Sequence, residues 1–234
     1  MIKVSARSWV LFGIAMLGAL AMGLVGWLRP FGEAGSLVVV DWGSAVVNAF
    51  CAALVFSVAF GFKPGEAVRL PWMLMGIAVA MNAVGDAIYA YYEVVLKVDA
   101  YPSIADVPYV AEYGFLFAAI MLTTRAYRGF FDWRAPLVKA VAAALVVLAG
   151  VYLLLLRPYI LPAGPDELTM MGKIVSTAYP VLDVVLVFGP VVYLAMLMSN
   201  FGKALVVWPW RMVAIGALVL AVTDSWYSYA DWAG

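Results

Sequence analysis

The chain has 234 residues, of which 67% are hydrophobic and 12% charged; its mean hydropathy is +1.01 and its formal net charge is zero. So apolar a composition excludes an ordinary soluble domain and predicts that the lipid bilayer is the solvent. The absence of histidine excludes haem ligation by His and His-based zinc sites, and the single cysteine, Cys51, excludes disulfides and thiolate metal clusters. No basic tract is long enough to bind nucleic acid.

Seven apolar stretches are long enough to cross a hydrocarbon core of about 30 Å. The breaks between them carry proline, glycine or charged residues, which are typical of turns. We therefore predict an all-α integral membrane protein whose residues 1–234 form a single seven-helix transmembrane domain. The predicted spans are about 8–28, 38–61, 71–96, 106–124, 135–156, 174–199 and 207–230.

The distribution of charge predicts the orientation of these spans. If the N-terminus lies inside, ten of the 14 Lys and Arg residues fall in cytoplasmic segments, as the positive-inside rule requires. Only two of the 14 acidic residues, Glu66 and Asp132, share that side. We expect a multi-pass protein of the cell (plasma or inner) membrane with its C-terminus outside.

Two segments share a pattern that places a carboxylate deep inside a span. Pro71-Trp72 is followed by Asp86, and Pro209-Trp210 is followed at the same spacing by Asp224. Each aspartate stands about 21 Å above the inner boundary, in the outer half of the bilayer. Charge within hydrocarbon marks a binding site, an ion path or a relay by default, although a buried interhelical hydrogen bond is the alternative.

Helical spacing indicates which polar groups meet. Asn82, Asp86, Tyr89 and Glu93 form one stripe, and shorter stripes run from Asp106 through Tyr109 to Tyr113 and from Asp224 through Tyr227 to Asp231. Polar stripes must face protein or water, so we expect these three to converge. The predicted ligand-binding residues are Asp86, Tyr89, Asp106, Tyr109, Asp183, Asp224 and Tyr227, with Asp41, Asn82 and Glu93 as further contributors.

Structural roles compete with ligand binding at several of these positions. Ser103 to Asp106 has the pattern of a capping box, so Asp106 caps a helix or binds a ligand. Asp41 and Asp183 are expected near N-terminal helix ends, where the helix dipole favours an anion. Glu112 points roughly 120° away from Asp106, which favours a helix–helix contact.

The segment Pro102-Ser103-Ile104-Ala105-Asp106, with Tyr109, resembles the PS-x-AD-x-x-Y signature of a bacterial and archaeal multi-helix membrane module. That module usually precedes diguanylate cyclase or histidine kinase domains as their sensory region. The resemblance extends over about residues 71–234, through Gly85-Asp86, Tyr179-Pro180 before Asp183, and Asp224. It implies a sensory role, although a further helix normally follows in that family. We expect either a truncated sensory region or a stand-alone relative that works through partner subunits.

These features favour a non-catalytic sensory or ligand-binding membrane module with an outward-facing Asp/Tyr pocket. Oxygen ligands suit a hard cation, with Asp86 and Asp224 as the metal ligands if a metal is bound, and an aromatic wall suits an organic cation. The alternatives are an accessory structural subunit of a larger membrane complex and an intramembrane carboxylate-dependent lipid hydrolase. The expected partners are the lipid bilayer and either partner subunits or further copies of the chain. Retinal is not expected, because every lysine lies at a span boundary or in a loop.

Overall fold

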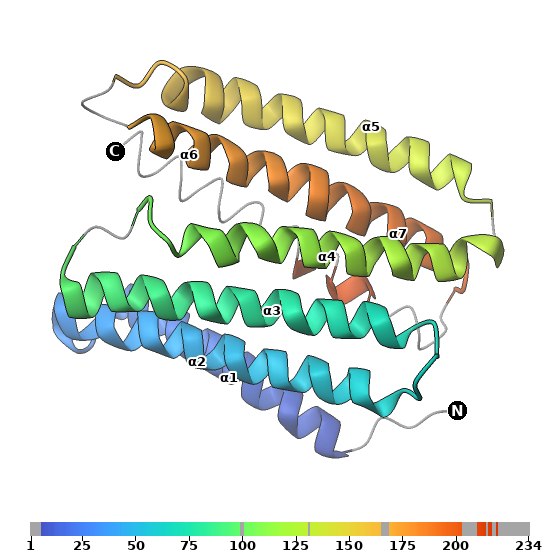
Figure 1. The fold of residues 1–234 in the computed structure, drawn as a ribbon, viewed down its shortest axis with the longest axis horizontal. Coiled ribbons are helices and arrows are strands. Elements are labelled where there is room, and N and C mark those ends of the chain that lie inside the picture. The colour runs from blue at the N-terminus through green and yellow to red at the C-terminus, as the bar shows by residue number, and fades with distance from the viewer. Residues whose placement is uncertain are drawn as a thin grey trace. The chain divides into compact units, whose positions relative to one another are not determined.

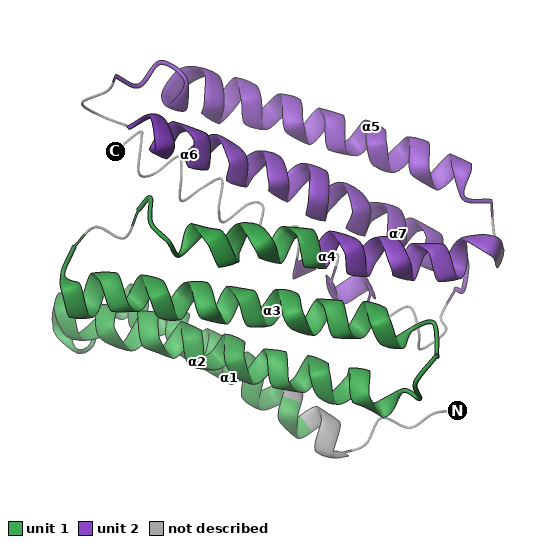
Figure 2. Ribbon diagram, in the orientation of Figure 1, with its two compact units in different colours: residues 1–115 green, residues 116–234 purple. Residues whose placement is uncertain are grey.

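The computed structural model describes residues 6–98, 101–130, 132–164, 169–202, 210–213, 215–216 and 219. Throughout this part of the chain the regular structure is helical (Figure 1). The chain divides into two compact units, residues 1–115 and residues 116–234 (Figure 2).

Unit 1 contains three long helices and the beginning of a fourth. Helix α3 continues directly into a π-helical segment, η1, and helix α4 begins in unit 1 and ends in unit 2. The bounds are α1 Ala6–Leu28, α2 Gly32–Gly61, α3 Arg69–Ala90, η1 Tyr91–Leu96 and α4 Asp106–Tyr127.

Unit 2 contains the end of α4 and two further long helical segments, each of which includes a π-helical stretch. Helix α5 continues into η3, and η4 joins α6 to α7 just after Pro180. A proline inside a helix removes a backbone donor, which accounts for irregular hydrogen bonding at this point. The bounds are η2 Arg128–Phe130, α5 Arg134–Val151, η3 Tyr152–Ile160, α6 Met170–Leu182, η4 Asp183–Phe188 and α7 Gly189–Ser199.

Five of the described helical segments are long and apolar enough to cross a membrane. They coincide with the predicted second to sixth spans, and α1 coincides with the first, with a shorter apolar part at Gly13–Leu28. Most of the predicted seventh span, 207–230, lies outside the described residues. The membrane-length segments are Gly32–Gly61, Arg69–Leu96, Asp106–Tyr127, Arg134–Ile160 and Met170–Ser199.

Small residues allow the helices of unit 1 to approach closely. Helix α2 packs against both α1 and α3. A Cβ atom at Gly76 of α3 would lie 2.8 Å from the ring of Phe56, and one at Gly18 of α1 would lie 3.1 Å from Val47. Such close approach is how helices associate in lipid, where apolar burial alone supplies little driving force.

In unit 2, α5 and η3 pack along the α6–η4–α7 segment (Figure 1). Leu194, Leu197 and Met198 of α7 are almost completely buried. On α5 and η3, by contrast, Val146 and Leu154 are each 73% exposed. Large apolar side chains exposed on a membrane-length helix are what lipid contact requires.

Candidate functional site

A cluster of polar side chains joins three membrane-length helices of unit 1. We call it the polar cluster; it contains Asn48 of α2, Asn82 and Asp86 of α3, and Tyr109 and Glu112 of α4. All five residues are partly buried. The predicted polar stripes of α3 and α4 therefore do converge.

Neutral side chains of α2 and α4 donate hydrogen bonds to the polar side chains of α3. The Nδ2 atom of Asn48 donates to Oδ1 of Asn82 at 2.8 Å and to Oδ2 of Asp86 at 2.7 Å. The hydroxyl of Tyr109 donates to the other oxygen of Asp86, Oδ1, at 2.8 Å. Each oxygen of the Asp86 carboxyl group therefore accepts from a neutral donor. Such bonds stabilise a carboxylate in a medium that would otherwise disfavour its charge.

The amide of Asn82 extends the network to a second acid. Its Nδ2 atom donates to Oε2 of Glu112 at 2.6 Å, while its Oδ1 atom accepts from Asn48. Both ends of this amide are thus used, and it links α2, α3 and α4 through one side chain. The prediction that Glu112 serves a helix–helix contact is confirmed.

The glycine before Asp86 makes room for the ring of Tyr109. A Cβ atom at Gly85 would lie 2.5 Å from Cε1 and 2.7 Å from Cδ1 of that ring. Real Cβ atoms do not approach carbon so closely, so only glycine permits the ring to lie this close to α3. The Gly85-Asp86 pair therefore combines a space for the Tyr109 ring with an acceptor for its hydroxyl.

A pair of acids, Asp41 and Glu93, lies nearer one end of unit 1. Glu93 is the acid that acts most strongly on the Asp41 carboxyl group, and Asp86 is the next. The Oδ2 atom of Asp41 is buried and meets no hydrogen-bond donor among the described residues. Ionised carboxylates only accept hydrogen bonds, so neither acid can donate to the other while both are charged. We call these two residues the carboxyl pair.

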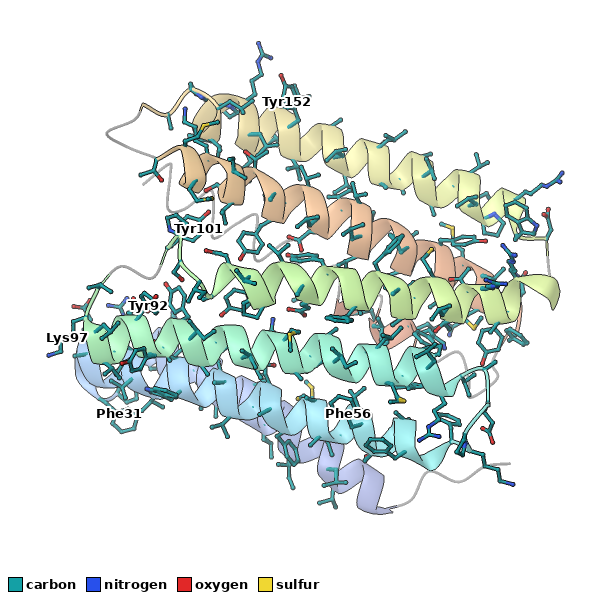
Figure 3. All side chains as sticks on the ribbon, in the orientation of Figure 1. Phe31, Phe56, Tyr92, Lys97, Tyr101 and Tyr152 are labelled. Atoms are coloured by element: carbon teal, nitrogen blue, oxygen red, sulfur yellow. The ribbon has the colours of Figure 1, made fainter. Side chains whose placement is uncertain are left out.

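The helix that carries Glu93 is irregular at this point. Glu93 lies in η1, and the chain then leaves the helix through Lys97, whose φ of 54° is left-handed. Figure 3 shows Lys97 at the same end of the unit 1 helices as Phe31, which precedes α2, while Phe56 lies toward the other end of α2.

Within the described residues, no salt bridge neutralises Asp41, Glu93 or Asp86. The only salt bridge in the described part of the chain joins Arg29 to Glu33, and both side chains are largely exposed. Within the same residues, no group of three His, Cys, Asp or Glu side chains has an arrangement that could hold a metal ion. Among the described residues, the carboxyl pair and Asp86 therefore have other acids and neutral donors as neighbours, and no basic side chain forms a salt bridge with them.

Asp106 has the capping geometry that its sequence context predicts. Its Oδ2 atom accepts a 2.7 Å hydrogen bond from the backbone N–H of Ser103, and Oγ of Ser103 accepts from the N–H of Ala105 at 3.1 Å. The reach of the acid back to the serine N–H is the second half of a capping box. These contacts support the structural role of Asp106 at the start of α4; a ligand role stays a prediction.

Two expectations about helix ends were wrong. Helix α2 begins at Gly32 instead of near residue 38, which places Asp41 about 13 Å along the helix. Asp183 stands about 20 Å from Met170, in the middle of a continuous helical segment, and is only 3% exposed. The helix dipole acts within the first turn, so it accounts for neither carboxylate.

The remaining predicted site residues fall into different parts of the chain, and two of them lie outside the described residues. Tyr89 lies near Tyr109 in unit 1, and Asp183 lies in unit 2. Asp224 and Tyr227 lie outside the described residues, so their convergence with Asp86 stays a prediction. Asn48 was missing from the predicted site, although it follows Asp41 by two helical turns and therefore shares its face of α2.

Comparison with known proteins gave no match to a family model, to a curated protein or to a solved structure.

Proposed function

We propose that this chain is a non-catalytic membrane sensory module that takes up a cation at the carboxyl pair. The proposal includes the seven-span arrangement with the N-terminus inside, in which the carboxyl pair lies in the outer half of the membrane. The observation that carries it is the proximity of Asp41 and Glu93, two partly buried acids with no basic partner among the described residues. Like charges in a medium of low dielectric repel strongly unless a cation or a proton intervenes.

The polar cluster supplies a route from cation binding to a change in helix packing. Asp41 belongs to α2 and Glu93 to the segment that continues α3, so neutralising their charges changes the energy of packing α2 against α3. Farther along the same two helices, Asn48 of α2 donates a hydrogen bond to Asp86 of α3. Tyr109 of α4 donates to the same carboxyl group, so α4 is linked to the pair as well. A charge change at the carboxyl pair therefore acts on three helices that are already linked by hydrogen bonds.

The geometry favours a proton or a singly charged cation over a metal ion. Ca²⁺ takes six to eight oxygen ligands, whereas the carboxyl pair offers two side chains and the described residues contain no three-residue metal group. Asp86 adds little coordinating capacity, because both of its oxygens already accept hydrogen bonds. A proton shared between Asp41 and Glu93 needs no further ligand.

Thermal unfolding of the purified full chain in nanodiscs tests this function. We would measure the melting temperature against pH between about 5 and 9, and at fixed pH against tetramethylammonium chloride and calcium chloride. If the folded state holds a shared proton that the unfolded chain releases, the unfolded chain binds fewer protons and stability falls as pH rises. If an organic cation is taken up instead, added tetramethylammonium raises the melting temperature.

A matched pair of variants separates the carboxyl pair from general surface charge. Asp41→Asn should flatten whichever dependence is found, whereas Glu33→Gln, which changes an exposed acid of the same helix, should preserve it. A melting temperature indifferent to pH and to both cations contradicts the proposal. So does an equal loss of the response in the Glu33 variant.

The polar cluster also supports a second candidate, a structural subunit of a larger membrane assembly. Both oxygens of Asp86 and both ends of the Asn82 amide are occupied by protein groups, as expected if the polar cluster holds helices together. Under this reading the chain co-purifies with a partner in fixed stoichiometry from mild detergent. Asp41→Asn should then leave the pH profile of the melting temperature unchanged.

A further inference from the structure

Four basic side chains surround the turn that joins α4 to α5 in unit 2. Arg125 and Arg128 stand one helical turn apart at the end of α4 and in η2, and Arg134 and Lys139 lie on the first turns of α5. All four are exposed, and Figure 3 shows nitrogen-tipped side chains around this turn. We call these four residues the basic patch.

The basic patch must lie at a membrane surface if α4 and α5 span the bilayer. Both are membrane-length segments, and they are consecutive in the chain, so the short connection between them emerges on one side. The aromatic ring of Trp133 lies in this connection, with the guanidinium carbon of Arg134 5.7 Å from its centroid. A tryptophan beside an arginine is typical of the headgroup region, where an amphipathic ring and a cation both find partners.

The charge of the basic patch is not compensated within the described protein. None of its members forms a salt bridge with a described residue. The nearest acid in sequence, Asp132, accepts a 3.0 Å hydrogen bond from the backbone N–H of Arg134 and so is directed toward the start of α5. This carboxylate therefore lies against the N-terminus of α5. The other charges of the basic patch remain available to an external anion.

We propose that the basic patch binds the phosphate groups of anionic phospholipids in the membrane leaflet that it faces. The occupant follows from charge complementarity and from position, because headgroup phosphates are the anions present at that depth in the membrane. Clusters of four or more Lys and Arg beside a transmembrane helix recognise anionic lipids in this way. The proposal is independent of cation uptake at the carboxyl pair.

The test uses the purified full chain in dodecyl maltoside, with the melting temperature followed as lipid is added. Phosphatidylglycerol should raise the melting temperature more than phosphatidylcholine at the same concentration. The Arg125→Gln, Arg128→Gln double variant should weaken the apparent affinity for phosphatidylglycerol by about tenfold or more. Inorganic phosphate at matched concentration should reproduce little of the gain.

Two controls make the result specific to the basic patch. Arg157→Gln removes an exposed arginine in η3, at the far end of the same helical segment, and should retain the response to phosphatidylglycerol. A variant with both Arg125 and Arg128 changed to Lys keeps the charge and should retain most of the response even if the Gln variant fails to fold. Equal responses to the two lipids, equal loss in the Arg157 variant, loss in the Lys variant, or full reproduction of the gain by inorganic phosphate would each overturn the proposal.

Discussion

The ring of Tyr109 occupies the space that a side chain at Gly85 would fill, and the same tyrosine donates a hydrogen bond to the next residue, Asp86. The packing of the ring at Gly85 and the hydrogen bond to Asp86 involve the same side chain, so a shift of the ring alters both contacts. The missing Cβ atom brings the ring against α3, and the ring position brings the hydroxyl to 2.8 Å from Oδ1. This relationship joins α3 to α4 through one packing contact and one polar contact.

Gly85→Ala should therefore destabilise the protein by about 1–3 kcal/mol, the usual cost of overpacking a well-filled contact. The new Cβ atom displaces the Tyr109 ring and lengthens its bond to Asp86. Gly114→Ala in α4 is the control, because a Cβ atom there meets nothing within 4 Å. Thermal unfolding measures both, and a Gly85→Ala variant as stable as the control would contradict the close contact.

Tyr109→Ala offers a second check on the same contact. Once the ring is removed, adding a Cβ atom at Gly85 should cost little more, so the two substitutions should be strongly non-additive in a double-mutant cycle. Additive losses of stability would show that the Gly85→Ala effect has another origin.

Asp86→Asn should cost about 1–3 kcal/mol although the side chain keeps its shape. Both carboxyl oxygens accept hydrogen bonds, from Tyr109 and from Asn48, and an amide offers only one acceptor. One donor must then face an N–H group, whichever way the amide is turned. Glu66→Gln, an isosteric change at an exposed turn, should be neutral in the same unfolding assay.

Asn82→Leu should destabilise by about 1–3 kcal/mol, because Glu112 loses the hydrogen bond that Asn82 donates while it stays inside a membrane-length helix. Replacing Glu112 by Leu in the same chain should recover part of that loss, since the acceptor of the lost hydrogen bond is then removed as well. If the double variant loses as much stability as the sum of the single variants, Asn82 and Glu112 do not act as a pair.

The predicted topology can be tested with single cysteines, because Cys51 is the only one in the chain. In a Cys51→Ser background, Val98→Cys and Glu66→Cys place thiols at exposed positions at opposite ends of α3 and η1. A membrane-impermeant maleimide applied to intact cells should label the position 98 variant only. Labelling of the position 66 variant alone would reverse the orientation and place the carboxyl pair on the inner side.

Hydropathy located the second to sixth spans well, apart from the start of α2. The turn from Gly32 to Ser36 contains Glu33, which lowers its apolar character, yet it is helical and its acid pairs with Arg29. An apolar window cannot detect a polar helical turn that projects beyond the hydrocarbon. Asp41 was consequently assigned to a helix end.

The polar cluster was only partly predictable, because spacing along one helix says nothing about the partner on the next. The stripe from Asn82 to Glu93 indicated the polar face of α3 correctly. Asn48 was missed because it is a single amide within an apolar span. Glu112 was correctly predicted to make a helix–helix contact, but the sequence did not identify Asn82 as the residue that it contacts. Both make hydrogen bonds between helices, which depend on how α2, α3 and α4 pack.

The bond between Asn82 and Glu112 has a consequence for how the chain enters the membrane during synthesis. Among the five membrane-length segments, α4 has the lowest hydropathy, and it carries Asp106 and Glu112. A segment of this kind inserts poorly by itself, because each intramembrane acid adds to its transfer free energy. Helix α3 is made first, and its Asn82 amide can receive Glu112 as α4 leaves the insertion machinery. Efficient insertion of α4 should therefore depend on the helix made before it.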